Sequence, residues 1–191
     1  LAGLCLLALM LLTGTLYLFQ DQLIFHPQPL GAAERQRFSE YQLTLEVNGE
    51  SLHGWYLPAD DPTDPLLIYY GGNAEEISWN IPYFRRQFSA SLLLVNYRGY
   101  GDSSGTPSAE ALKIDALALF DQLQSSTATR GPVILMGRSL GSGVASYVAS
   151  QRPVDRVILV TAYDSLAELA QSHYPWLPVK PLIRHRFNSI A

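Results

Sequence analysis

The sequence has little of the material from which metal centres, disulfide frameworks and nucleic-acid surfaces are built. Its single cysteine, Cys5, cannot form an intrachain disulfide, so cysteine usage does not indicate a redox compartment. The four histidines are scattered, and no Cys/His cluster has metal-ligand spacing. Charged residues make up only 16% of the chain, and the formal net charge is −4. The sequence has no basic cluster, which argues against nucleic-acid binding as the main function. We therefore expect no metal, no cofactor and no nucleic acid, and the oligomeric state stays open.

Charge is also absent from residues 1–19, which form one apolar run. A helix rises about 1.5 Å per residue, so this run nearly spans the roughly 30 Å hydrocarbon layer of a bilayer. Tyr17 and Phe19 lie near its end, where aromatic residues favour the membrane interface. We predict an uncleaved single-pass anchor over residues 1–20. The sequence starts with neither Met nor a basic flank, so the positive-inside rule does not assign the side of the membrane.

Two processing signals are alternatives to this anchor. A secretory signal peptide usually has an apolar core of about 7–15 residues and an Ala-x-Ala-like cleavage site, and that site is missing here. Lipoprotein processing at Cys5 fits less well, because Leu4 is larger than the residue that usually precedes such a cysteine and the apolar run continues past it.

The remaining chain divides into a connector, residues 21–40, and an α/β domain, residues 41–191. Residues 41–47 alternate apolar and polar side chains, and Asn48-Gly49 then predicts a tight hairpin to a return strand over 51–57. Continuous apolar runs, typical of buried parallel strands, cover 65–70, 91–97, 132–136 and 156–160. Helices are predicted between them, including 74–88 and one that Thr106 would cap with Pro107 at its first position. The pattern predicts a mostly parallel sheet with an N-terminal antiparallel hairpin and helices on both faces.

The segment Gly137-Arg138-Ser139-Leu140-Gly141 follows one of these strands and leads into small residues that favour a helix, 142–150. Gly-x-Ser-x-Gly in a strand–turn–helix context is typical of a nucleophile elbow, whereas the same letters in a small-residue loop would arise by chance. We predict Ser139 as the nucleophile. The N–H of Leu140, at the start of the helix, would be one donor to an oxyanion.

Two further glycine-containing loops follow strands. In Gly71-Gly72-Asn73-Ala74-Glu75, the Asn73 N–H would supply a second oxyanion donor. A plainer alternative is that the Asn73 side chain caps the next helix, and the two roles are compatible. The loop over 96–105 lacks the Lys-Ser/Thr of a phosphate-binding loop and the third glycine of a dinucleotide fingerprint. We interpret it as a structural turn beside the site.

The order of these motifs resembles the α/β-hydrolase superfamily, and most of all its membrane-anchored, serine-aminopeptidase-like branch. The segments at 23–27, 161–165 and 174–178 are also similar to that branch. The resemblance implies an α/β-hydrolase fold and a serine hydrolase that cleaves an ester, thioester or amide through an acyl-enzyme. The family usually has His where this chain has Gly71, but a backbone donor at Asn73 does not need that side chain.

The same resemblance implies eight strands, with the triad acid after the seventh and the His after the eighth. Six strands are predicted here, so we expect the sequence to stop before the last strands and to be inactive alone. Asp164 is an alternative acid, although a turn or a cap before a helix over 165–170 describes it better. His173 and His185 are interpreted as surface or lid residues. Residues 165–189 remain open as lid, membrane contact or core.

The sequence is compatible with two alternative functions. The first is a membrane-anchored serine hydrolase acting at Ser139 on a small-molecule or lipid-like acyl substrate, whose identity the sequence does not give. The second is a non-catalytic α/β-hydrolase-like module that serves as a membrane scaffold or receptor.

Overall fold

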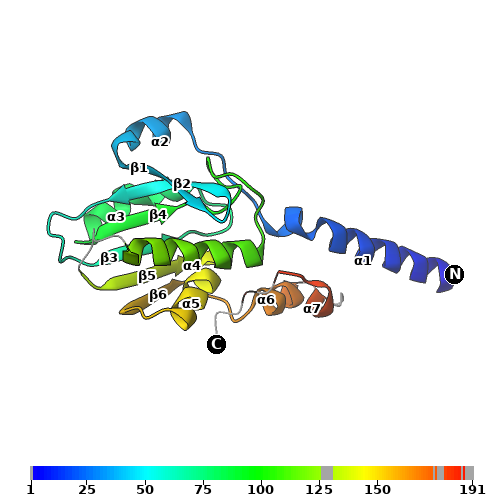
Figure 1. Cartoon of the computed structure of the whole chain (residues 1–191). Helices are drawn as coiled ribbons and strands as arrows, with labels where there is room; N and C mark the ends of the chain where they lie inside the picture. The colour runs from blue at the N-terminus through cyan, green and yellow to red at the C-terminus, as the bar shows by residue number, and fades with distance from the viewer. Residues whose placement is uncertain (1, 126–130, 174, 176–178, 186, 188–191) are drawn as a thin grey trace.

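A computed structural model describes residues 2–125, 131–173, 175, 179–185 and 187. It shows a single sheet flanked by helices, from which the long first helix, α1 (Ala2–Ile24), projects (Figure 1). Most of the α1 side chains that the structure describes are exposed, and the helix is long and apolar enough to cross a membrane over Leu7–Ile24. This helix fits the predicted anchor, and it continues four residues beyond position 20 before the chain enters the sheet.

The sheet contains six strands among the described residues, in the order β1-β2-β4-β3-β5-β6. The strands are β1 (Gln42–Val47), β2 (Glu50–Leu57), β3 (Leu66–Tyr70), β4 (Ser91–Val95), β5 (Val133–Arg138) and β6 (Arg156–Val160). Strand β2 pairs antiparallel with both β1 and β4, while β4, β3, β5 and β6 are parallel neighbours. The predicted mostly parallel sheet with an antiparallel hairpin is therefore confirmed. Asn48 and Gly49 both have positive φ in the hairpin turn, at 52° and 80°.

Two apolar cores lie on opposite faces of the sheet. Alternate side chains of β3 divide between them, with Ile68 in one core and Leu67 and Tyr69 in the other. The first core is covered by α4 (Ala109–Ser125) and α5 (Leu140–Gln151), the second by the 3₁₀ helix η2 (Ile77–Asn80) and α3 (Ile81–Gln87). A sheet buried on both faces is what the continuous apolar strands predicted.

Two helix starts differ from the prediction. The segment after β3 becomes helical at Ile77, not at residue 74, because the preceding residues form a separate loop, and the Glu76 carboxylate accepts from the Ser78 N–H at 3.3 Å. Helix α4 begins at Ala109, and the Ser108 hydroxyl accepts from the Ala111 N–H at 3.1 Å. Thr106 is therefore not its cap.

The connector and the C-terminal segment contain short helices. Between α1 and the sheet lie α2 (Ala32–Arg37) and the 3₁₀ helix η1 (Ser39–Tyr41), neither of which was predicted. After β6, α6 (Leu166–His173) and α7 (Val179–Leu182) lie beside the end of α1 (Figure 1). The Arg184 N–H donates to the Gln20 side chain at 2.7 Å, so the C-terminal segment contacts the end of the apolar helix directly.

Candidate active site

Ser139 occupies a strained turn between β5 and α5. Its φ of 49° and ψ of −115° lie outside the regions that non-glycine residues favour. The flanking glycines are required by close backbone approach: a Cβ at Gly141 would meet the Tyr70 carbonyl oxygen at 2.0 Å, and one at Gly137 would meet the Gly141 oxygen at 2.2 Å. The Ser139 N–H donates to the Val160 oxygen at 2.9 Å, which ties the turn to β6. This is the local geometry that the Gly-x-Ser-x-Gly pattern predicts.

The Ser139 side chain is half-buried, and its hydroxyl makes no hydrogen bond to any described residue. The loop after β3 lies next to it, since a Cβ placed on Gly72 would be 3.9 Å from the Ser139 Cβ. Leu140 is the first residue of α5, so its N–H has no partner within the helix. The predicted nucleophile and the predicted oxyanion loop are therefore neighbours. The roles of Ser139, Leu140 and Asn73 stay predictions.

The loop after β3 is held by a buried carboxylate for which no local sequence pattern predicts a role. The Glu75 side chain, 9% exposed, accepts from the Gly72 N–H at 2.6 Å, from the Tyr69 hydroxyl at 2.9 Å and from the Asn80 amide. Arg138, beside Ser139, lies 3.9 Å from the same carboxylate. The sequence pattern places Glu75 inside the helix predicted over 74–88. Because the chain becomes helical only at Ile77, Glu75 lies in the preceding loop and holds it.

Two tyrosines from the glycine-containing loop after β4 complete this support. The Tyr97 hydroxyl donates to the Gly71 carbonyl oxygen at 2.9 Å, and the Tyr100 hydroxyl donates to the Asn73 side-chain oxygen at 2.7 Å. Burial raises the pKa of both hydroxyls, so each remains a neutral donor at physiological pH. The loop over 96–105 thus lies beside the site, as predicted, and also carries groups that hold the site together.

Asn73 does not cap the following helix. Its side-chain oxygen accepts from the His26 N–H at 3.0 Å, and its amide donates to the Ile24 carbonyl oxygen. The alternative prediction of a helix cap was therefore wrong, because the cap is Glu76 and the Asn73 side chain binds the chain where it leaves α1. The Asn73 backbone N–H makes no hydrogen bond within the described part of the chain.

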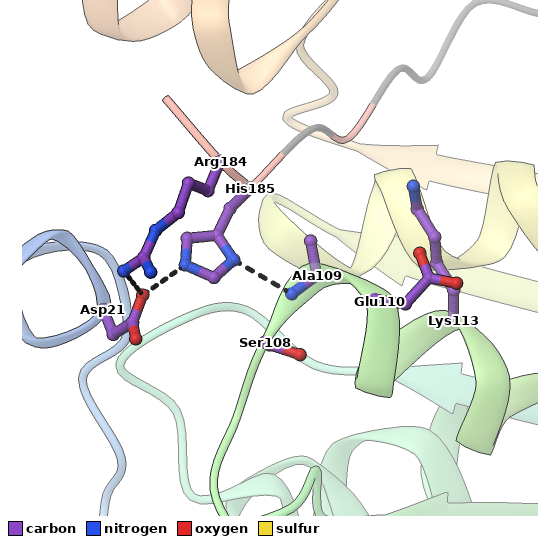
Figure 2. A pocket seen from close by; sticks show the side chains of 7 residues that line it. All are labelled: Asp21, Ser108, Ala109, Glu110, Lys113, Arg184 and His185. Atoms are coloured by element: carbon purple, nitrogen blue, oxygen red, sulfur yellow. Dashed lines mark hydrogen bonds and ion pairs between the residues drawn. The ribbon is translucent and has the colours of Figure 1, made fainter. Parts of the chain in front are cut away.

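His185 is buried, so the interpretation as a surface residue was wrong, while a place in a lid stays a prediction. Its Nε2 lies 2.5 Å from the Asp21 carboxylate, and its Nδ1 accepts from the Ala109 N–H at 3.2 Å, which makes Nε2–H the donor to Asp21 (Figure 2). Arg184 also reaches Asp21, at 3.0 Å. These residues line a cavity of about 340 Å³ between the end of α1 and the start of α4. Since both ring nitrogens are engaged, His185 does not serve Ser139 as a base in this arrangement.

Of the other two candidates for triad partners, only the Asp164 side chain is described. Asp164 is exposed in the loop after β6 and makes no hydrogen bond to a described residue. The cap of α6 is its neighbour: the Ser165 hydroxyl accepts from the Glu168 N–H at 3.0 Å. His173 ends α6, and its side chain lies outside the described residues. Among the side chains that the structure describes, neither Asp164 nor His185 binds the Ser139 hydroxyl, and the predicted nucleophile lies beside the predicted oxyanion loop.

Comparison with known proteins decides the family. A family model described as the alpha/beta hydrolase fold matches residues 52–187. The chain belongs to this family. A solved member, alpha/beta hydrolase domain-containing protein 10 from mouse, shares the fold with a TM-score of 0.55 at 22% identity, over 74% of this chain and 56% of that one.

Relatives in this family share more of the sequence. An uncharacterized protein of Mycobacterium tuberculosis is 33% identical over 178 residues, which cover 90% of this chain and 63% of that protein. An uncharacterized membrane protein of Saccharomyces cerevisiae is 33% identical over 184 residues, 90% of this chain and 65% of the relative. The lysophosphatidylserine lipase ABHD12 of Bos taurus is 33% identical over 128 residues, 62% of this chain and 32% of that protein. The chain thus spans less than two thirds of the length of each of these relatives.

Proposed function

We propose that this chain carries the nucleophile and the oxyanion hole of a membrane-anchored serine hydrolase. The observation that supports this most is the strained turn at Ser139, whose side chain faces a loop held by Glu75. Such strain persists only where surrounding structure enforces it, and at a nucleophile elbow it keeps the hydroxyl exposed to substrate.

In the proposed reaction, the Ser139 Oγ attacks an acyl carbonyl carbon while a histidine base takes the hydroxyl proton. The carbonyl oxygen becomes an oxyanion, to which the Leu140 and Asn73 N–H groups donate. The intermediate collapses when the bond to the leaving group breaks, and that group takes the proton from the histidine. Water then attacks the acyl carbon while the histidine takes its proton, and the bond to the Ser139 Oγ breaks as the histidine returns that proton to the serine oxygen, which releases the acid. We further propose that Asp164 and His185 are not the acid and base, because one is exposed without a partner among the described residues and the other is engaged at both nitrogens.

For the substrate, we propose a lipid-like acyl ester that reaches the site from the membrane. The exposed apolar helix α1 ends directly at the candidate site, through the contacts of Asn73. The bovine relative is named a lysophosphatidylserine lipase and the yeast relative a membrane protein, which supports a lipid class without specifying a headgroup.

A fluorophosphonate probe, which reacts with activated serines, tests this proposal on the protein expressed from its natural reading frame in phospholipid vesicles. Wild-type protein should be labelled and Ser139→Ala should not. Ser150→Ala, at an exposed serine of the same helix α5, is the matched control and should be labelled like wild type.

The alternative is a non-catalytic membrane module, and one observation favours it: within the described residues, no histidine or carboxylate binds the Ser139 hydroxyl. Absence of Ser139-dependent labelling would support this alternative and end the hydrolase proposal.

A further inference from the structure

The chain leaving α1 is bound to the candidate oxyanion loop by one side chain. Asn73 uses both ends of its amide: the oxygen accepts from the His26 N–H at 3.0 Å, and the nitrogen donates to the Ile24 carbonyl oxygen. Ile24 is the last residue of α1. An asparagine amide offers the same donor and acceptor pair as a backbone peptide, so Asn73 binds this segment much as a neighbouring strand would.

The arrangement is reinforced from the loop after β4. The Tyr100 hydroxyl donates to the same Asn73 oxygen at 2.7 Å, and the Gly101 N–H donates to the Gln28 carbonyl oxygen at 2.9 Å. Phe25 lies between the two residues that Asn73 binds, and it is buried in the first core, which α4 and α5 cover. The first residues after α1 are therefore fixed to the domain core and to both loops beside Ser139.

We infer that Asn73 is a positioning residue that sets the oxyanion loop against the end of the anchor helix. This inference rests on the proposed function, in which the Asn73 backbone N–H is the oxyanion donor. The side chain and the donor belong to one residue, so whatever holds the side chain also fixes the direction of the N–H. Through this link, the position of α1 in the bilayer and the geometry of the oxyanion hole are connected.

The substitution Asn73→Ala tests this role, because it removes all three side-chain hydrogen bonds, to His26, Ile24 and Tyr100, and leaves the backbone N–H in the chain. Asn73→Asp keeps an acceptor for His26 and Tyr100 but turns a carboxylate oxygen towards the Ile24 carbonyl, where a donor is required. Gln22→Ala is the matched control, since Gln22 is an exposed amide in the last turns of α1 without a contact to the loop.

Two measurements on the natural protein in phosphatidylcholine vesicles test the inference. Hydrogen–deuterium exchange over residues 71–75 should be faster in both Asn73 variants and unchanged in Gln22→Ala. Fluorophosphonate labelling should show a maximal rate lowered about tenfold or more with little change in the half-saturating probe concentration, because a misplaced donor costs transition-state binding and not ground-state binding. A purely structural loss would instead lower the labelled fraction without slowing the folded remainder.

Exchange over residues 71–75 equal to wild type in Asn73→Ala, or equally raised in Gln22→Ala, would overturn the inference. An unchanged maximal rate despite faster exchange would also overturn it, because the loop would then not depend on Asn73 for function. If wild-type protein is not labelled at Ser139, the proposed function fails, while the exchange measurement still decides whether Asn73 holds the loop.

Discussion

The two sides of Ser139 are built very differently. On the side of the candidate oxyanion loop, residues 71–75, every residue of β3 and β4 is buried, and the loop is held by Glu75 and the two tyrosines. On the other side, β6 is the sheet edge among the described strands, and its side chains are exposed or half-exposed, with Leu159 at 41%.

This difference shows which part of the candidate site the core determines. The turn at Ser139 and the candidate oxyanion loop are placed by close-packed backbone and buried polar contacts, so they form wherever the β3–β4–β5 core forms. The loop after β6 packs Tyr163 against the first core, but Asp164 in the same loop is exposed and makes no hydrogen bond to a described residue. The following predictions test whether the two sides respond as differently as their surroundings imply.

The largest effect is expected where backbone meets backbone. Gly141→Ala would place a Cβ 2.0 Å from the Tyr70 carbonyl oxygen and 2.7 Å from that of Gly71, neither of which can move without shifting β3 and the oxyanion loop. We expect a loss of about 3 kcal/mol or more in the free energy of unfolding, measured by urea denaturation. Gly14→Ala, in α1 with nothing within 4 Å of the new Cβ, should leave stability nearly unchanged. Similar losses in both variants would contradict the tight packing at the elbow.

A pair of leucines compares the central strand β4 with the strand β6 at the edge of the described sheet. Leu94 in β4 is fully buried, whereas Leu159 in β6 is 41% exposed. Leu94→Ala should destabilise the domain by about 2–5 kcal/mol through lost burial and a cavity. Leu159→Ala should cost less than about 1 kcal/mol, because little is removed from a packed environment. Equal losses in urea denaturation would mean that β6 is covered in solution.

Loss of the buried Glu75 carboxylate should lower the unfolding free energy less than a core substitution and more than loss of a surface ion pair. Glu75→Gln places an NH₂ group where three donors converge, from Gly72, Tyr69 and Asn80, so at least one buried donor loses its acceptor. We expect a loss of about 1–3 kcal/mol in unfolding free energy and faster hydrogen exchange over residues 71–75. Glu168→Gln, in an exposed pair with Lys180 at 2.5 Å, is the control and should cost less than about 0.5 kcal/mol. An unaffected loop in Glu75→Gln would remove the carboxylate from the account of the site.

Much of this architecture follows from sequence pattern, and the failures are informative. The strands predicted over 41–47 and 156–160 are present as β1 and β6, and the Asn48-Gly49 turn and the turn at Ser139 also follow the prediction. Each rests on local chemistry: alternation, positive φ or close backbone approach. The helix predicted from residue 74 began late because Glu75 and Glu76, which fit a helical pattern, are used by loop contacts and a cap.

The long-range contacts were not predictable in this way. Nothing local indicates that Asn73 binds Ile24 and His26, or that His185 pairs with Asp21, since these partners lie 47 to 164 residues apart in sequence. A histidine in an amphipathic segment has the same sequence appearance whether exposed or buried, and only the packing of α1 against the C-terminal segment distinguishes the two.

The smallest expected effect is a pH dependence of the unfolding free energy that comes from His53, a buried residue of β2. His53 in β2 is buried against Trp55, and this burial lowers the pKa of its imidazole, with a raising contribution from Asp102 and a lowering one from Arg35. The unfolded chain therefore takes up a proton at a pH where folded His53 stays neutral, so stability is lost as the pH falls through the unfolded value. Unfolding free energy should decline between about pH 7.5 and about pH 5.5, and His53→Gln should flatten that decline. A slope that survives in His53→Gln would assign the proton uptake to another group.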